Sequence, residues 1–178
     1  HLGIGGGTIK ELLIQVDYYK MFCPNLVFIQ SGIVDCSPRA LSKFEIEIIN
    51  RIPLVSNQLK YLIRQNSKIL RKVRNYTYTS KSDYKEAIHL FRTKFKDSNV
   101  FAIEIMPSSS EYEIKVPGIT ENITSYNSLL KECYGENVIS LADFGPNEII
   151  SDFHHMNEIG NQKLFKRIKS IVDIYLGL

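Results

Sequence analysis

Three short apolar segments, separated by long amphipathic ones, constrain the fold of this chain more than any other feature of its sequence. The segments 26–32, 99–107 and 137–144 are rich in β-branched and aromatic residues, which predicts three strands. The longer segments between them place apolar residues at helical spacing. Strands that alternate with helices are typical of a mostly parallel sheet with helices on both faces. We therefore expect an α/β fold, built as a three-layer α/β/α sandwich.

The helical spacing also gives the boundaries of the expected helices. It predicts helices over residues 8–22, 40–52, 56–73, 83–95 and 123–134, and a terminal helix that starts near His155 or Met156. Loops are expected over 75–82 and 108–119. The sequence contains no internal repeat and no linker, so residues 1–178 are expected to form a single domain.

The charge balance and the cysteines limit the classes of protein that fit. The chain has 22 basic and 19 acidic side chains, an excess too small to indicate nucleic-acid binding. Its densest basic segment, KILRKVR (68–74), predicts a solvated helix face rather than a nucleic-acid patch. Every apolar segment is well short of the roughly 18 residues that a membrane span requires. The three cysteines are far apart, so we expect a cytoplasmic protein without a disulfide framework or a zinc site.

Polar residues follow each predicted strand at its carboxyl end. The polar segments are GIVDCSPR (32–39), PSSSEYE (107–113) and, after a short loop, DFHH (152–155). In an open α/β sheet, functional side chains gather beyond the carboxyl ends of the strands. We therefore expect Asp152 and His155 to share a cleft with Asp35.

The spacing of Asp152 and His155 suits a catalytic pair. In a tight turn, a carboxylate three residues before a histidine can accept the imidazole Nδ1–H, which leaves Nε2 free to act as a base. Such a pair can activate a serine hydroxyl. The same segment also fits a helix start, because Ser151 or Asp152 would suit an N-cap position. The spacing alone leaves both interpretations open.

The segment around this pair resembles a motif of a known enzyme family. The last motif of the SGNH/GDSL hydrolases is a D-x-x-H followed by an Asn, a Gly and an amphipathic helix, and it is similar to SDFHHMNEIGNQKLFKRI (151–168). The resemblance implies the flavodoxin-like sandwich of that family and a Ser-His-Asp triad that contains Asp152 and His155. His154 occupies a variable position of the motif and is expected to be a turn residue.

Two earlier motifs of the family have counterparts in the same order. The second is similar to GIGGGTIKELL (3–13), which implies that the backbone N–H of Gly6 lines an oxyanion hole, although a glycine cluster alone also fits a phosphate-binding turn or a flexible end. The third resembles LVFIQSGIVD (26–35), but Val34 replaces the asparagine that donates to the oxyanion. Losing such a donor typically reduces the stabilisation of the transition state by about 2.7–4 kcal/mol. Asp35 is expected to hold the loop rather than to react.

The serine nucleophile of the family has no counterpart in this sequence. It belongs to a G-D-S motif upstream of the glycine cluster, so the resemblance implies a protein that begins earlier and supplies the first strand and the serine. We do not assign the role to Ser31, which lies within a predicted strand, or to Ser108, which lies out of motif order. Cys36 would need a depressed pKa to act instead.

Taken with the resemblance, these motifs imply a hydrolase that cleaves an ester, without a metal or an organic cofactor. The expected partner is a small-molecule or glycan ester, such as an O-acetyl group on a carbohydrate. Tyr112 and Arg39 are candidates for contact with a sugar or a carboxylate, with a simple surface role favoured for each. Two alternatives stay open: an O-acyltransferase that acts on a glycan, and a non-catalytic binding module. The oligomeric state also stays open.

Overall fold

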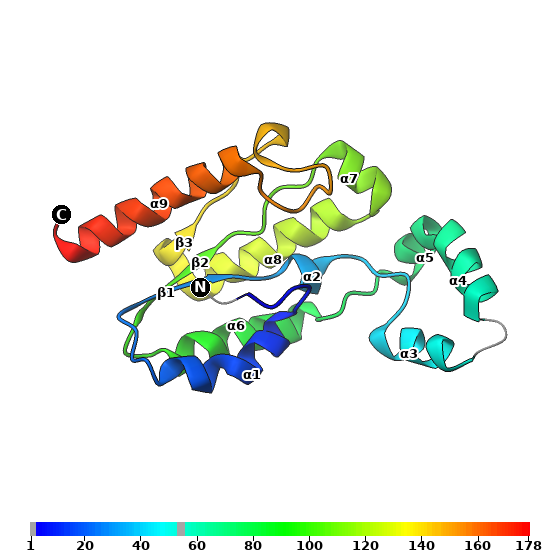
Figure 1. The fold of residues 1–178 in the computed structure, drawn as a ribbon, viewed down its shortest axis with the longest axis horizontal. Helices are drawn as coiled ribbons and strands as arrows, with labels where there is room; N and C mark the ends of the chain where they lie inside the picture. Colours follow the sequence, from blue (N-terminus) through cyan, green and yellow to red (C-terminus); the bar gives the residue numbers. More distant parts are fainter. Residues whose placement is uncertain (1–2, 53–55) are drawn as a thin grey trace.

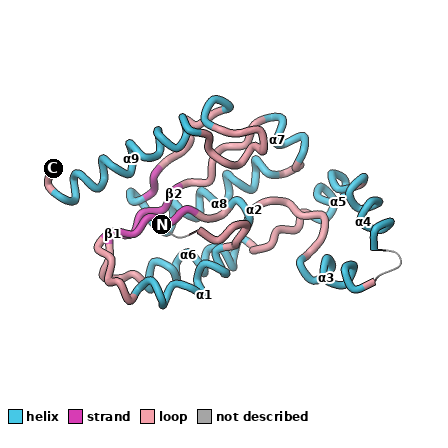
Figure 2. Tube along the Cα trace, in the orientation of Figure 1, coloured by secondary structure: helices cyan, strands magenta, loops and turns pink. Residues whose placement is uncertain are grey.

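The centre of the molecule is a parallel sheet. A computed structural model describes residues 3–52 and 56–178. The strands β1 (Leu26–Gln30), β2 (Asn99–Ile103) and β3 (Val138–Ile139) lie side by side in the order β1-β2-β3 (Figures 1 and 2). Leu26 pairs with Asn99, and Ala102 pairs with Val138. The expected α/β class and the parallel sheet are thus confirmed.

Helices cover both faces of this sheet, because side chains alternate between the faces along each strand. Val100 and Ala102 pack into a core with residues of α1 (Ile9–Lys20), α6 (Lys81–Lys94) and α8 (Ile119–Tyr134). Phe101 and Ile103 point to the other face and join a second core with Leu164 of α9 (Glu158–Leu176). The molecule is therefore the expected three-layer sandwich, in which α9 packs on the second face, and Figure 1 shows α1 and α6 on one side of β1 and α9 on the other.

A helical arm projects from the sandwich. It consists of α3 (Lys43–Arg51), α4 (Ser56–Gln65) and α5 (Ser67–Arg74), which lie together at the right of Figure 1. Residues 56–74 include six basic and no acidic side chains. Hydrogen bonds from Arg71 Nη1 to the carbonyl of Lys115 (2.9 Å) and from Arg74 Nη1 to that of Ala40 (2.8 Å) attach the arm to the sandwich.

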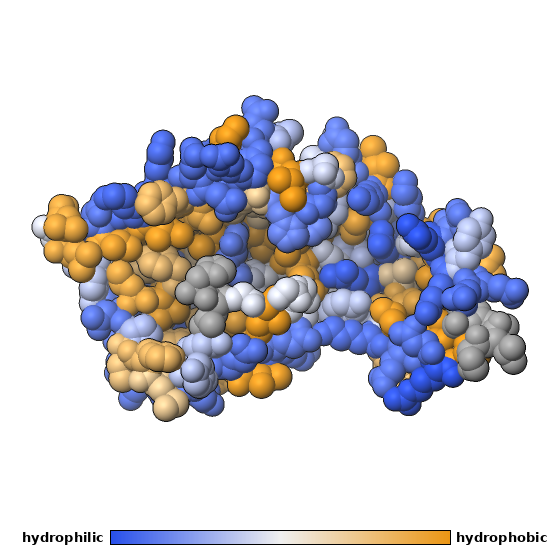
Figure 3. All heavy atoms as spheres, viewed as in Figure 1, coloured by the Kyte–Doolittle hydropathy of each residue, from blue (hydrophilic) through white to orange (hydrophobic). Residues whose placement is uncertain are grey.

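β1 forms the edge of the sheet among the described residues, and apolar side chains flank it. Ile14 of α1 and Phe22, just after α1, are largely exposed, as are Ile174 and Leu176 of α9. Figure 3 shows a broad apolar area between these two helices. This side of the sandwich therefore offers both unpaired strand backbone and apolar surface.

Two of the expected helices have different boundaries in the structure. The segment 56–73, expected as one helix, forms α4 and α5, which are separated at Asn66. The terminal helix begins at Glu158 rather than near His155, because the side chain of Asn157 accepts the N–H of Gly160 (3.0 Å) and caps the helix there.

Two other segments also differ from expectation. The segment 108–119, expected as a loop, contains α7 (Ser110–Lys115), because the hydroxyl of Ser109 accepts the N–H of Tyr112 and caps a new helix. The strand expected over 137–144 is shortened to β3, because the carboxylate of Glu104 accepts the N–H of Leu141 (2.8 Å) and takes it out of the ladder.

Short helices complete the chain. They are α2 (Ile33–Cys36), η1 (Gly135–Asn137) and η2 (Pro146–Glu148). None of the helices in residues 3–52 and 56–178 combines the length and apolar composition needed to cross a membrane. The features that position the candidate site are thus α2 after β1, α7 after β2, and the loop between η2 and α9 after β3.

Candidate active site

The loop between η2 and α9 is folded as a small hairpin. Ile149 and Met156 form an antiparallel bridge, and the N–H of Ile150 donates to the carbonyl of His155 (3.0 Å). Phe153 lies at the tip with a φ of +73°, a left-handed conformation that is uncommon for a residue with a side chain. The hairpin therefore fixes the backbone on both sides of its tip.

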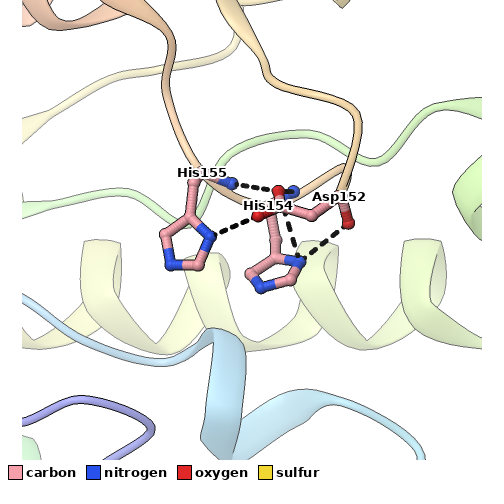
Figure 4. A group of neighbouring side chains, drawn as sticks. All are labelled: Asp152, His154 and His155. Carbon is pink, nitrogen blue, oxygen red and sulfur yellow. Dashed lines mark hydrogen bonds and ion pairs between the residues drawn. The ribbon is translucent and has the colours of Figure 1, made fainter.

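This hairpin brings Asp152 and His155 together. Nδ1 of His155 lies 2.6 Å from Oδ2 of Asp152, while Oδ1 accepts the backbone N–H groups of His154 and His155 at 3.0 Å each (Figure 4). An ionised carboxylate can only accept, so Nδ1 carries a proton, and in the neutral ring the lone pair is on Nε2. The ring of His155 is thus in the tautomer that a general base requires.

The same hydrogen bonds determine the charge of Asp152. Partial burial alone would raise the pKa of its carboxyl group. The backbone N–H of His154, the ring of His155 and the backbone N–H of His155 outweigh burial and lower the pKa to about 2. Asp152 is therefore ionised near neutral pH and stabilises a protonated imidazole beside it.

His154 lies against a different set of side chains. Its Nδ1 lies 2.8 Å from the carbonyl of Asp152, and its ring stacks on that of Tyr112 with the centroids 6.1 Å apart. Tyr112 also stacks on Phe153 (5.8 Å). Figure 4 shows the rings of His154 and His155 on the same side of the loop. His154 is thus a turn residue that packs the hairpin against α7.

The ring of His155 is open to solvent. Its side chain is 66% exposed, and its Nε2 atom has no hydrogen-bond partner among the described residues. Two surface cavities of about 450 and 270 Å³ lie elsewhere, and neither is lined by Asp152 or His155. The Nε2 lone pair is therefore available to a group outside the described residues.

Asp35 performs a structural task at the end of β1. It is completely buried, and it accepts the N–H of Ile9 (3.1 and 3.2 Å), the hydroxyl of Thr79 (2.6 Å) and that of Ser31 (3.4 Å). Burial raises the pKa of its carboxyl group, and these hydrogen bonds oppose the rise. Asp35 therefore fixes the start of α1 to α2 and makes no hydrogen bond to His155.

Gly6 lies in the turn just before α1. A hydrogen bond from Gly7 to the carbonyl of Ile4 (3.1 Å) closes this turn, and Gly6 adopts a φ of +67° that suits glycine. Through Asp35, the turn is held at the same end of the sheet as α2. No hydrogen bond among the described residues joins Gly6 to His155.

The remaining candidates near β1 do not contact the pair. Ser31 follows the strand, which ends at Gln30, rather than lying within it as expected, and its hydroxyl points to Asp35. The carbonyl of Val34 accepts a hydrogen bond from Arg39. Burial, followed by the negative charge of Asp35, raises the pKa of Cys36 to about 12. The Cys36 thiol is therefore protonated near neutral pH and unsuited to nucleophilic attack.

Among residues 3–52 and 56–178, Asp152, His154 and His155 form a group that could also hold a metal ion. One ligand atom from each lies within 4.8 Å of the others. Both Nδ1 atoms are already hydrogen-bonded, to the carboxylate and to the carbonyl of Asp152. A cation at either Nδ1 atom would have to replace these hydrogen bonds, which give the hairpin its shape.

Two arginines lie close to Tyr112. Tyr112 is buried in α7, and burial raises the pKa of its hydroxyl, whereas a hydrogen bond with Ser37 and the positive charges of Arg39 and Arg71 oppose the rise. The sequence analysis names Arg39 as a candidate for ligand contact, whereas it predicts that Arg71 lies on the solvated face of a basic helix. The sequence carries no local signal for Arg71, because its neighbours come from the segments that precede α3 and follow β2.

The comparisons with known proteins concern the fold. Neither a family model nor a curated protein matches this chain. Among solved structures, the crystal structure of the lipase/acylhydrolase from Enterococcus faecalis is similar, with a TM-score of 0.59 over 89% of this chain and 67% of that chain, at 15% identity.

At 15% identity, the similarity to this solved structure shows the fold of the chain. The chain is an α/β sandwich with the architecture of that lipase/acylhydrolase, and its Asp–His hairpin lies beyond the carboxyl end of the last strand. Polar side chains in this position are typical of active sites in open α/β sheets.

Proposed function

We propose that this chain belongs to a serine ester hydrolase of the SGNH/GDSL type, in which His155 is the general base and Asp152 orients it. The observation that carries this proposal is the 2.6 Å hydrogen bond between Nδ1 of His155 and the carboxylate of Asp152. The lipase/acylhydrolase-like fold supports it, since this fold holds the hairpin at the edge of the sheet where ligands bind.

The proposed reaction has two halves. A serine hydroxyl attacks the acyl carbonyl and gives its proton to Nε2 of His155, which then delivers the proton to the leaving alkoxide. A water molecule later hydrolyses the acyl-enzyme by the same route. Asp152 stays ionised and stabilises the imidazolium, and the backbone N–H of Gly6 donates to the oxyanion.

The serine in this proposal comes from the G-D-S motif that the resemblance places upstream of the glycine cluster. In a parallel sheet, the strand that carries it would need a neighbour with unpaired backbone. The free edge of β1 among the described residues and the apolar side chains beside it support a place for that strand.

The proposed substrate is a small-molecule or glycan ester, for example an O-acetyl group on a carbohydrate. An O-acyltransferase would use the same residues, with a sugar hydroxyl in place of water. Transfer of the acetyl group to an added glycan acceptor, followed by mass spectrometry, distinguishes this alternative from hydrolysis.

The test uses the full-length protein with a short-chain aryl acetate. Replacing His155 by Ala should lower kcat/KM by about 10⁴-fold, because the general base is lost. His89→Ala is the matched control, because His89 is an exposed histidine on α6 outside the hairpin, and it should leave kcat/KM unchanged. Turnover that survives His155→Ala would contradict the proposed triad.

A non-catalytic binding module is the second candidate. Val34 favours it, because its side chain cannot donate to an oxyanion. A full-length protein that shows no turnover of aryl acetates, and whose serines do not react with a fluorophosphonate probe, would favour this candidate over the hydrolase.

A further inference from the structure

Two arginine side chains lie near the candidate site without a carboxylate partner. Arg51, Arg74 and Arg167 each form an ion pair with a carboxylate on the described chain. Among the described residues, no carboxylate pairs with Arg39 or Arg71. Arg64 and Arg92 also form no ion pair with a carboxylate among the described residues, but only Arg39 and Arg71 in addition contain a buried Nε atom without a hydrogen-bond partner.

Each of these two guanidinium groups is held in place by neutral groups. Arg39 donates from Nη2 to the carbonyl of Val34 (3.2 Å) and stacks over the ring of Tyr78, with 4.4 Å between its Cζ atom and the ring centroid. Arg71 donates from Nη1 to the carbonyl of Lys115 (2.9 Å). These contacts fix the orientation of both side chains but leave both charges uncompensated.

The Nε atoms of Arg39 and Arg71 are buried and have no hydrogen-bond partner among the described residues. Buried polar groups in proteins are nearly always paired, and an unpaired one reduces stability. Burial lowers the pKa of the Arg71 guanidinium, and the positive charge of Arg39 lowers it further. Both side chains approach the end of α7: Arg71 donates to the carbonyl of Lys115, and Pro38, the neighbour of Arg39, would lie 3.7 Å from a Cβ atom added at Gly118. This arrangement costs stability unless an anion completes it.

Tyr112 connects the two arginines to the candidate active site. Arg71 donates to the carbonyl of Lys115 in α7, the helix that carries Tyr112, and the ring of Tyr112 stacks on His154, the neighbour of the proposed base. Burial raises the pKa of the Tyr112 hydroxyl, while a hydrogen bond with Ser37 and the charges of Arg39 and Arg71 oppose the rise. The side chains of Tyr112 and His154 would therefore lie between such ligand groups and His155.

We propose that Arg39, Arg71 and the hydroxyl of Tyr112 form a binding site for a phosphate group carried by the ester substrate. Two guanidinium groups match the two negative charges of a phosphate monoester better than the single charge of a carboxylate, and their N–H groups fit its oxygens. Small rotations of the side chains would let the buried Nε–H groups donate to the same anion. The link to an ester rests on the proposed function, whereas phosphate binding does not.

The first test measures the binding of inorganic phosphate by isothermal titration calorimetry. Arg71→Gln should weaken phosphate binding by about tenfold or more, because it removes a charged hydrogen-bond donor. Arg74→Gln is the matched control: it lies on the same helix, removes the same charge, and is already paired with Glu45 (2.9 Å). It should change the affinity less than about twofold.

A titration with acetate in place of phosphate tests whether the site prefers an anion with two negative charges to an anion with one. The unaltered chain should bind phosphate at least about tenfold more tightly than acetate. The proposal would be overturned if the unaltered chain bound no phosphate, or if it bound phosphate and acetate with equal affinity. It would also be overturned if Arg71→Gln and Arg74→Gln lost phosphate affinity equally. Thermal unfolding of both variants shows whether they are folded.

The second test uses the full-length enzyme with an acetyl ester of glycerol 3-phosphate and with a neutral aryl acetate. Arg71→Gln should raise KM about tenfold for the phosphate-bearing ester and leave KM for the neutral ester within about twofold. Phosphate binding without any esterase activity would contradict the proposed function and leave the anion site intact. An equal rise of KM for both esters would overturn the substrate assignment.

Discussion

At the residue scale, the charge of Asp152 depends on three hydrogen bonds within one turn. They lower its pKa to about 2, against about 4 for an aspartate in an unfolded chain. A depressed pKa in the folded state means that ionised Asp152 stabilises the fold. This stabilisation is complete above about pH 5 and is lost as the pH falls through 4 towards 2.

We therefore expect the stability difference between the unaltered chain and Asp152→Asn to shrink as the pH is lowered from about 5 to 2. Urea denaturation at several pH values measures this difference, and a ¹³C NMR titration of the Asp152 carboxyl group measures its pKa directly. If the stability difference between the two proteins stays constant over this pH range, the hairpin does not stabilise the ionised form of the Asp152 carboxylate.

A second residue-scale prediction concerns Asp35, which accepts hydrogen bonds from Ile9 and Thr79 in the core. Asp35→Ala should lower the free energy of unfolding by about 2–4 kcal/mol, because it leaves these buried donors unpaired. Asp97→Ala is the control, since Asp97 is exposed, and it should change the free energy of unfolding by less than about 0.5 kcal/mol. Chemical denaturation provides both values.

At the element scale, the start of α9 fits closely against the hairpin. A Cβ atom added at Gly160 would collide with the backbone carbonyl of Glu148, just before the hairpin begins. Gly160→Ala should therefore destabilise the fold by about 1–3 kcal/mol and displace His155. Gly5→Ala, at a position with no atom within 4 Å of the added Cβ, is the matched control.

The position of His155 can be followed by the low-field NMR resonance of its Nδ1–H. That resonance reports the hydrogen bond to Asp152 and should weaken or shift in Gly160→Ala but not in Gly5→Ala. An unchanged resonance in Gly160→Ala would show that the hairpin holds its shape independently of α9.

Local patterns in the sequence predict some elements and not others. β1 and β2 begin where the apolar runs predicted, and the Asp152–His155 spacing predicted a contact that lies within one turn. The end of β3 was not predictable, because Glu104, 37 residues away from Leu141 in sequence, ends the ladder. Arg71 was missed for the same physical reason, since its neighbours come from distant segments.

At the scale of the whole molecule, burial is divided unequally between the sandwich and the helical arm. α6 and α8 each bury several large side chains in the core, whereas α5 buries none. Helices without buried side chains open locally at a low free-energy cost.

Hydrogen exchange followed by mass spectrometry tests this difference. Backbone amides of α5 should exchange on the order of 100-fold faster than those in the middle of α8. Similar protection in both helices would indicate that the arm and the sandwich unfold as one unit.

The basic character of the arm also gives the molecule a permanent dipole. Residues 56–74 carry six positive charges and no negative ones, whereas the net charge of the whole chain is +3, so the remainder is net negative. An anion that diffuses towards such a molecule is attracted to the arm and repelled elsewhere, which steers its encounters to one end. Because salt shortens the range of this field to about 8 Å at physiological ionic strength, the association rate of anionic ligands should fall as salt is added.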